Sequence, residues 1–193
     1  MKLKTVSHLS VLILIFTLNC KEKDWRDDPK YQNPDLQAKV ESAKQEILSN
    51  RKKSYSIENG YTSKEEAIKG FLKELVESKE LGYYSSFISW EQQLQVVFPN
   101  TYGFGTALDF NPLDDYRKLL SEREQVGFLT IKANLKEPYK IQKIEWEKPR
   151  QYNQLIAHKP KVIITSNAKE IDLSQIKMVY EIGGKFIVGV VGP

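Results

Sequence analysis

The sequence has few residues that could crosslink the chain or bind a metal ion: among 193 residues there is one cysteine, Cys20, and two histidines, His8 and His158. A single thiol cannot form an intramolecular disulfide, so the fold must depend on a hydrophobic core. Zinc sites need several thiolate or imidazole ligands, which this chain does not supply. We therefore expect no disulfide, no metal site and no bound cofactor.

Sequence motifs of common catalytic sites are also missing. There is no G-x-S-x-G nucleophile elbow and no EF-hand loop, and Gly103-x-Gly105 lacks the third glycine and the preceding strand of a phosphate-binding motif. His158 lies between Ala157 and Lys159, and we interpret it as a hydrogen-bonded or exposed histidine rather than a catalytic one. We expect that the protein is not an enzyme.

Acid–base chemistry by carboxylates is the one enzymatic route that the sequence leaves open. Two of the clustered acidic residues, Asp114 and Asp115, follow Pro112 in the first turn of an expected helix, where they complement the helix dipole. This role accounts for them without chemistry. The cluster comprises Asp109, Asp114, Asp115, Glu122 and Glu124.

Charge excludes nucleic acid as a partner. The chain has 29 lysine and arginine residues against 25 aspartate and glutamate residues, which leaves no strong excess of either sign. Phosphate binding needs a concentrated basic face, and the runs 51–53 and 159–161 are too short to form one.

The first twenty residues have the pattern of an export signal. Lys2 and Lys4 precede an apolar run from Leu9 to Leu18, and a charged stretch follows from Lys21. A membrane-spanning helix needs about 20 apolar residues, so this run is too short to be one. We predict a signal peptide over residues 1–19.

The end of this signal, Thr17-Leu18-Asn19-Cys20, resembles the lipobox of bacterial lipoproteins. The commonest bacterial pattern has Leu at the third residue before the cysteine and Gly, Ala or Ser directly before it. Thr17 and Asn19 differ from that pattern, and the looser signal resembles that of spirochaete-type lipoproteins. The resemblance implies cleavage before Cys20, attachment of a diacylglycerol to its sulfur and usually a further acyl chain. Two or three acyl chains anchor a protein stably, so the implied partner is a lipid bilayer, at the outer membrane, the periplasmic face or the cell surface.

After the lipidated cysteine, the charged residues 20–33 predict a tether, and residues 34–193 predict a single domain. A peripheral amphipathic helix is expected within residues 34–52, from Pro34 to about Asn50. A second helix is expected behind the capping box at Thr62-Ser63. A short helix should begin at Ser89 and end at Pro99, and another should begin at Pro112 and break at Gly127.

Alternating polar and apolar residues replace the helical period after Pro138. The sequence therefore predicts an α+β fold, with N-terminal helices packed on a C-terminal curved antiparallel sheet of about four strands. Gly183-Gly184 predicts a two-residue hairpin turn before a last strand that should be covered on both faces. The element order is similar to nuclear-transport-factor-like cone folds, which implies helices over a bent sheet and a pocket between them. The candidate strands are Tyr139–Glu147, Leu155–Thr165 with an interruption near Pro160, Gln175–Ile182 and Lys185–Val191.

Nine aromatic rings fall between residues 83 and 116. Such a concentration fits an apolar ligand pocket, but the interpretation that we favour is a helix-on-sheet core whose space these rings fill. Tyr102 and Phe104, on a glycine-flanked loop, are candidates for exposed anchors. The candidate pocket residues are Tyr83, Tyr84, Trp90, Tyr102, Phe104 and Tyr116.

Three functional hypotheses follow. The first is a lipid-anchored envelope protein that acts as a non-enzymatic binding or interaction module, with an envelope protein as partner. The second is a cone-fold protein that binds a small apolar ligand in an aromatic pocket, with acid–base activity as an added option. The third is an adhesin-like surface protein that engages host molecules.

Overall fold

The structure is a computed structural model that describes residues 33–78 and 84–193. The chain divides into two units between Gln37 and Ala38, and the architecture given below is that of the second unit. The predicted signal peptide, Cys20, all but the last residue of the predicted tether, and Tyr83 lie outside the described residues. No helix in the described part of the chain is both long and apolar enough to cross a bilayer.

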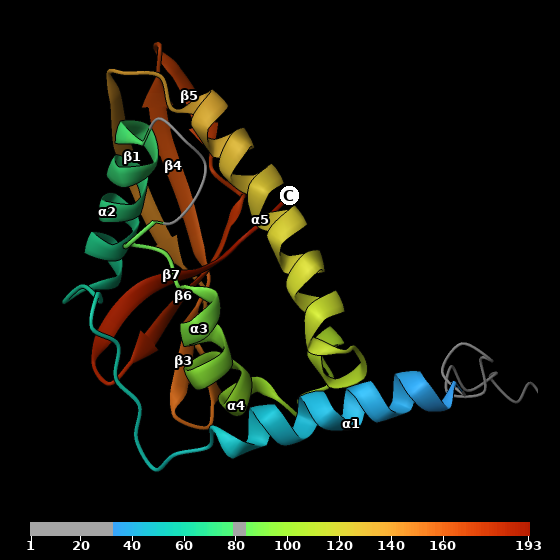
Figure 1. Ribbon diagram of the computed structural model, residues 1–193. Helices are drawn as coiled ribbons and strands as arrows, with labels where there is room; N and C mark the ends of the chain where they lie inside the picture. Colours follow the sequence, from blue (N-terminus) through green and yellow to red (C-terminus); the bar gives the residue numbers. More distant parts are fainter. Residues whose placement is uncertain (1–32, 79–83) are drawn as a thin grey trace, which may run out of the picture. The chain divides into compact units, whose positions relative to one another are not determined.

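Helices precede strands along the chain, which confirms the α+β prediction (Figure 1). The helical segments are α1 (Pro34–Ser49), α2 (Lys64–Glu77), α3 (Trp90–Gln92), the π-helical turn η3 (Gln93–Val97), α4 (Phe98–Thr101), the 3-10 turn η4 (Ala107–Phe110) and α5 (Leu113–Asn134). The strands are β1 (Tyr139–Trp146), β2 (Arg150–Tyr152), β3 (Leu155–His158), β4 (Pro160–Ser166), β5 (Lys169–Asp172), β6 (Ile176–Ile182) and β7 (Lys185–Val191).

The strand region is more divided than expected, since seven strands in two antiparallel sheets replace one curved sheet of about four. The sheets have the strand orders β1-β4-β5 and β2-β3-β6-β7. The interruption predicted near Pro160 is confirmed, since Lys159 separates β3 from β4; the two halves join different sheets. Pro160 begins β4 and has no N–H to donate, so the chain changes sheets where the ladder is weakest.

The outer edge of β7 is covered, although the strand is not central in its sheet. β7 ends the strand order of its sheet, which would leave one edge without a neighbouring strand. Tyr61 instead bridges Phe186 and donates its backbone N–H to the Phe186 carbonyl at 2.8 Å. The Ile88 N–H donates to the Val188 carbonyl at 3.0 Å. Two loop segments thus complete the hydrogen bonding of the last strand.

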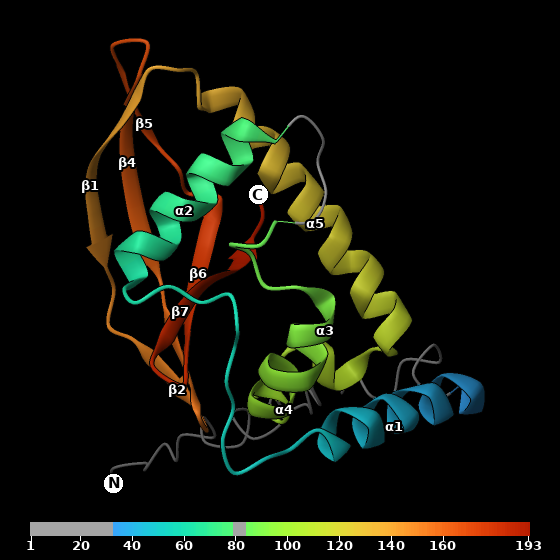
Figure 2. The same ribbon diagram turned by 60° about the vertical axis from the view of Figure 1, so that its left-hand side comes forward.

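Helix α2 confirms the capping prediction. The Ser63 side chain accepts a hydrogen bond from the Glu66 N–H at 3.1 Å, which satisfies one of the free amides at the helix start. α2 and α5 both contact β7 and also contact each other, as Figures 1 and 2 show. The fully buried core side chains of α2 are Ile68, Phe71, Leu72 and Leu75.

The prediction that Pro99 ends the third helical segment is wrong, since α4 continues to Thr101. The preceding turn, η3, is wound as a π-helix and ends with the Phe98 N–H bonded to the Gln93 carbonyl. Pro99 follows directly, near the start of α4, where a missing N–H costs least. The π turn and the proline together join α3, η3 and α4 into one helical stretch.

The predicted break of α5 at Gly127 is also wrong, because the helix continues to Asn134. A Cβ at residue 127 would lie 2.5 Å from Val191 Cγ1 and 2.8 Å from the Gly192 backbone nitrogen. The glycine therefore allows α5 to approach the end of β7 closely. Close packing of α5 against β7 explains the glycine at this position. Helix propensity alone predicts a break there, because it takes no account of tertiary contacts.

Candidate functional site

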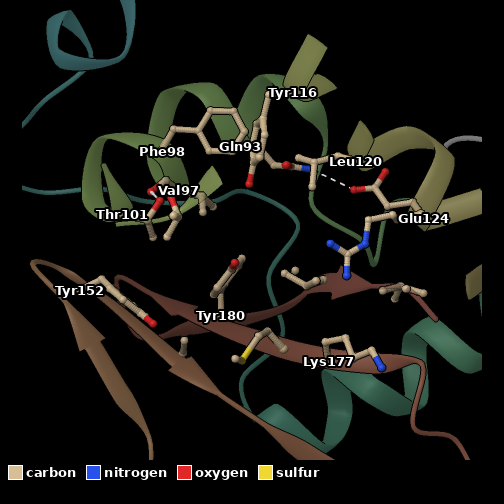
Figure 3. A pocket seen from close by; sticks show the side chains of 18 residues that line it. Gln93, Val97, Phe98, Thr101, Tyr116, Leu120, Glu124, Tyr152, Lys177 and Tyr180 are labelled. Carbon is tan, nitrogen blue, oxygen red and sulfur yellow. Dashed lines mark hydrogen bonds between the residues drawn. The ribbon is translucent and has the colours of Figure 1, made fainter. Parts of the chain in front are cut away.

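A cavity of about 240 Å³ lies between α5, the η3–α4 stretch and the four-stranded sheet (Figure 3). Ligand pockets are commonly about 300–1,000 Å³, and a dry cavity of about 150 Å³ holds benzene. The volume therefore suits one aromatic ring or a short hydrocarbon chain. In Figure 3 the helices lie above the cavity and the strands below it; the labelled lining residues are Gln93, Val97, Phe98, Thr101, Tyr116, Leu120, Glu124, Tyr152, Lys177 and Tyr180.

Three tyrosines from three elements line this cavity: Tyr116 from α5, Tyr152 from β2 and Tyr180 from β6. Figure 3 shows the hydroxyls of Tyr116 and Tyr180 directed toward each other. Burial raises the pKa of both phenols, and the proximity of Tyr116 and Tyr152 raises the pKa of Tyr180 further. Both hydroxyls are therefore protonated at neutral pH and can donate hydrogen bonds to a ligand.

A glycine in β7 makes room for Tyr180. In the β6–β7 ladder, a Cβ added to Gly189 would lie 2.0 Å from Cδ2 of the Tyr180 ring. The ring therefore lies over the glycine backbone, close against the sheet. A larger residue at position 189 would force the ring off the sheet toward the cavity.

The carboxyl group of Glu124 belongs to the cavity wall. Burial raises its pKa to about 7, against a smaller lowering effect of the hydrogen bond from Gln93. That bond runs from Gln93 Nε2 to Glu124 Oε1 at 3.4 Å, and Gln93 itself is buried (Figure 3). Near neutral pH the carboxyl group is about half protonated, so it can either donate or accept a hydrogen bond.

A second cavity, of about 220 Å³, lies on the other side of the Gln93–Glu124 pair. Gln93, Leu120 and Glu124 line both cavities, so these three side chains form the wall between them. The Arg117 guanidinium lies 5.2 Å from the centre of a Trp90 ring that lines the second cavity. The two volumes are thus separated by a single layer of side chains.

The structure divides the six candidate pocket residues. Tyr116 lines the first cavity, whereas Tyr84 and Trp90 line the second. Tyr102 lines neither of these cavities, and neither does Phe104, which is 52% exposed and packs edge-on against Tyr152 at 5.1 Å. Tyr83, the sixth candidate, is outside the described residues. Tyr84 also belongs to a packed ring cluster, as the core interpretation expected; its members are Phe71, Tyr84, Phe87 and Phe128.

Sequence reasoning missed four residues of the first cavity: Tyr152, Tyr180, Arg123 and Lys177. Tyr152 ends the three-residue strand β2 after two exposed residues, and Tyr180 follows the buried Val179 in β6, so neither strand has an alternation that marks its tyrosine as a cavity residue. The one available signal was Gly189 inside an otherwise apolar strand, because an interior glycine often marks a close approach.

Of the clustered carboxylates, only Glu124 lines the cavity beside the tyrosines. Asp109 instead organises its own loop, where it accepts the backbone N–H groups of Gly103 at 2.8 Å and Gly105 at 2.7 Å. Asp114 and Asp115 lie in the first turn of α5, as predicted, and Glu122 is exposed on the same helix. The cluster in sequence is therefore not a cluster in space.

His158 is a hydrogen-bonded histidine, as expected. Its Nε2 lies 2.9 Å from Glu181 Oε2, and its ring contacts Trp146 and Phe186. In β3 it alternates with Ala157, which lines the cavity, so His158 belongs to the opposite face of the sheet.

The raised pKa of Glu124 predicts a pH-dependent stability. Its carboxyl group binds a proton more tightly in the folded chain than in the unfolded chain, so stability falls as pH rises from about 4.5 to about 7. A Glu124→Gln variant lacks this loss. We expect it to be about 1–3 kcal/mol more stable than the wild type at pH 8 and nearly equal to it at pH 4.5, in urea unfolding followed by circular dichroism. If the difference in unfolding free energy between Glu124→Gln and the wild type were the same at pH 4.5 and pH 8, the burial of this carboxyl would be contradicted.

The described residues contain no group of three or more histidine, cysteine or acidic side chains positioned to bind a metal ion. The polar groups of the cavity are instead hydroxyls, an amide, a carboxyl and the cationic side chains of Arg123 and Lys177.

The chain was compared with protein-family models, curated proteins and solved structures, and it matches none of them. The function must therefore be argued from the cavity itself.

Proposed function

We propose that the protein is a lipid-anchored bacterial envelope lipoprotein whose domain binds a small, largely apolar molecule in the cavity beneath α5. The lipobox-like sequence ending at Cys20 supports the anchor. The single observation that carries the binding function is the 240 Å³ cavity with its three inward tyrosines and the Glu124 carboxyl. The proposal includes no chemical step.

The lining suits a molecule with one polar group. Val97, Leu120, Met178 and Val191 supply apolar surface, and burial of apolar ligand area against it contributes about 25 cal/mol per Å². A few polar groups set among such residues orient a ligand without making the site hydrophilic. The tyrosine hydroxyls and Glu124 provide these groups here.

The size of the cavity argues against a packing defect. Protein interiors have few voids larger than a water molecule. This one is partly open to solvent and is lined in part by hydroxyl, carboxyl and cationic groups, so water can occupy it when no ligand is bound. A hollow of this size and lining is therefore best explained as a site that a ligand or water fills.

The binding function predicts that a bulky residue at position 120 abolishes ligand uptake. The probe is p-cresol, whose single methylated ring fits the cavity, added to the purified full chain and followed by calorimetry and ligand-observed NMR. Leu120 lines both cavities, so Leu120→Trp should weaken p-cresol binding by at least about tenfold, the equivalent of about 1.4 kcal/mol.

The matched control is Leu119→Trp. Leu119 precedes Leu120 on α5 but is 40% exposed, so the same substitution adds its ring to the outer surface of the helix. The control should bind p-cresol within about twofold of the wild type. Equal binding by both variants would exclude the cavity as the site, provided that both unfold cooperatively at similar temperatures.

Acid–base catalysis is a second candidate that Glu124 favours, because a group with a pKa near 7 is suited to proton transfer at neutral pH. Catalysis requires, in addition to the cavity, a substrate proton within reach of this carboxyl. Binding requires the cavity alone. Binding is therefore the function that we propose.

A further inference from the structure

We propose that the molecule bound in the first cavity is a small carboxylate, whose charged end is held by the Arg123 guanidinium together with the hydroxyls of Tyr116 and Tyr180. This inference rests on the proposed binding function and assigns a chemical class to its ligand. The remainder of the ligand would be a ring or short chain that lies among the apolar side chains.

Arg123 is the cation that fits this role. It extends from α5 at the cavity wall toward the end of β7, where its Nε lies 3.9 Å from the position that a Cβ on Gly192 would occupy. No aspartate or glutamate within residues 33–78 and 84–193 forms an ion pair with it. A guanidinium carries a permanent charge and a planar set of N–H donors that matches both oxygens of a carboxylate.

Two hydroxyl donors lie at the same place. Tyr116 and Tyr180 line the same cavity as Arg123, and the positive charge of Arg123 partly offsets the rise that burial causes in the pKa of Tyr116. The Tyr180 hydroxyl faces the Tyr116 hydroxyl across the cavity (Figure 3). Across the described ranges, neither hydroxyl donates to a protein acceptor, and neither belongs to the fully buried polar atoms without a partner, so both are open to the cavity. Both donors are thus available to an acceptor group of a ligand that replaces water there.

Arg123 is exposed at the mouth of the cavity and has no anionic partner among the described residues, so an anionic ligand gains a charge interaction there that a neutral polar ligand does not. Lys177 lies at the edge of the same cavity and adds a second positive charge at longer range (Figure 3). The one acidic side chain in the lining is Glu124, which is about half neutral near pH 7. The potential at the Arg123 end of the cavity is therefore positive, which favours an anion.

The inference predicts a preference for charge between two probes of equal shape. We would titrate the purified full chain at pH 6 with 4-methylbenzoate and with its neutral isostere 4-methylbenzamide, using calorimetry. The carboxylate should bind at least about tenfold more tightly. Arg123→Gln should reduce that preference to about twofold or less.

The matched control is Arg117→Gln. Arg117 lies on the same helix, but its guanidinium packs over Trp90 at the second cavity. This variant changes the net charge by the same amount as Arg123→Gln. It should keep the carboxylate preference, which separates a specific contact from a general effect of protein charge.

A second arm uses pH. 4-Methylbenzoate stays ionised between pH 6 and pH 8, whereas Glu124 loses its proton over this range and places a negative charge beside the bound anion. The affinity should fall by about three- to tenfold from pH 6 to pH 8 in the wild type, and should not change in Glu124→Gln. The charged and titratable groups that line the two cavities together with Glu124 are Arg117, Arg123 and Tyr116 on α5, Lys177 and Tyr180 on β6, Tyr152 on β2, and Tyr84 in the segment before α3.

The outcomes separate this inference from the function on which it rests. If the benzoate and the benzamide bind equally, or if Arg123→Gln keeps the preference, the carboxylate assignment is overturned while small-molecule binding stands. If neither compound binds and p-cresol also fails, the binding function is overturned as well. A preference that Arg123→Gln removes and Arg117→Gln keeps supports the assignment.

Discussion

Replacing Cys20 with alanine is expected to move the protein almost completely from the membrane fraction to the aqueous phase. Each buried methylene of an acyl chain contributes about 0.8 kcal/mol to membrane binding, so two or three long chains give anchoring that is effectively permanent. The thiol is the attachment point that the lipobox resemblance implies, and Cys20 is the only cysteine of the chain. The measurement is partitioning in a phase-separating detergent, combined with metabolic labelling by palmitate.

The matched control for this prediction is Asn19→Ser. It changes the neighbouring residue, keeps the thiol and brings the signal closer to the commonest bacterial pattern. This variant should remain labelled and should partition with the detergent. A Cys20→Ala protein that still sediments with membranes, or a native protein whose Cys20 has an unmodified mass, would contradict the anchor.

The elements that the sequence predicted well are those with local signals. The capping pattern at Ser63 and the helical period behind it depend only on residues within one turn of each other. Gly183 and Gly184 have φ values of 56° and 78°, as a two-residue hairpin turn of the predicted type requires. The strand that follows has the predicted bounds, Lys185–Val191, because an apolar strand after such a turn has only one register available.

The predictions that failed concern residues whose role depends on a distant neighbour. Pro99 was read as a helix end, but the π turn before it allows the helix to continue. Gly127 was read as a break, but it is the point where α5 meets Val191. Both interpretations followed average propensities, which tertiary contacts can override.

The cavity could not be predicted for the same reason. Its polar groups come from α5, β2 and β6, which are separated by up to 64 residues along the chain, from Tyr116 to Tyr180. Which face of a strand a residue occupies changes with a shift of one position in register. Glu124 was noticed as a member of an acidic cluster, but its burial, and hence its raised pKa, depends on the packing of η3 against α5.

The largest effect on stability is expected from Phe71→Ala. Phe71 is fully buried on α2, and its ring lies 5.9–6.2 Å from the rings of Tyr84, Phe87 and Phe128. Removing a buried phenylalanine ring loses its transfer free energy and leaves a cavity, at a cost of about 3–5 kcal/mol. The midpoint of thermal unfolding should fall by about 10 °C, in differential scanning calorimetry.

Phe104→Ala is the control that isolates burial as the cause, because the chemical change is the same. Phe104 is 52% exposed and contacts the Tyr152 ring at one edge, so its loss should cost less than about 1 kcal/mol. Comparable losses in the two variants would mean that the rings of Tyr84, Phe87 and Phe128 do not pack tightly around Phe71. In that case the same three rings, which also line the second cavity, would not form a fixed wall for it. The pair of variants therefore tests whether the cavities beneath α5 are enclosed by a rigid core, as selective binding of a small ligand requires.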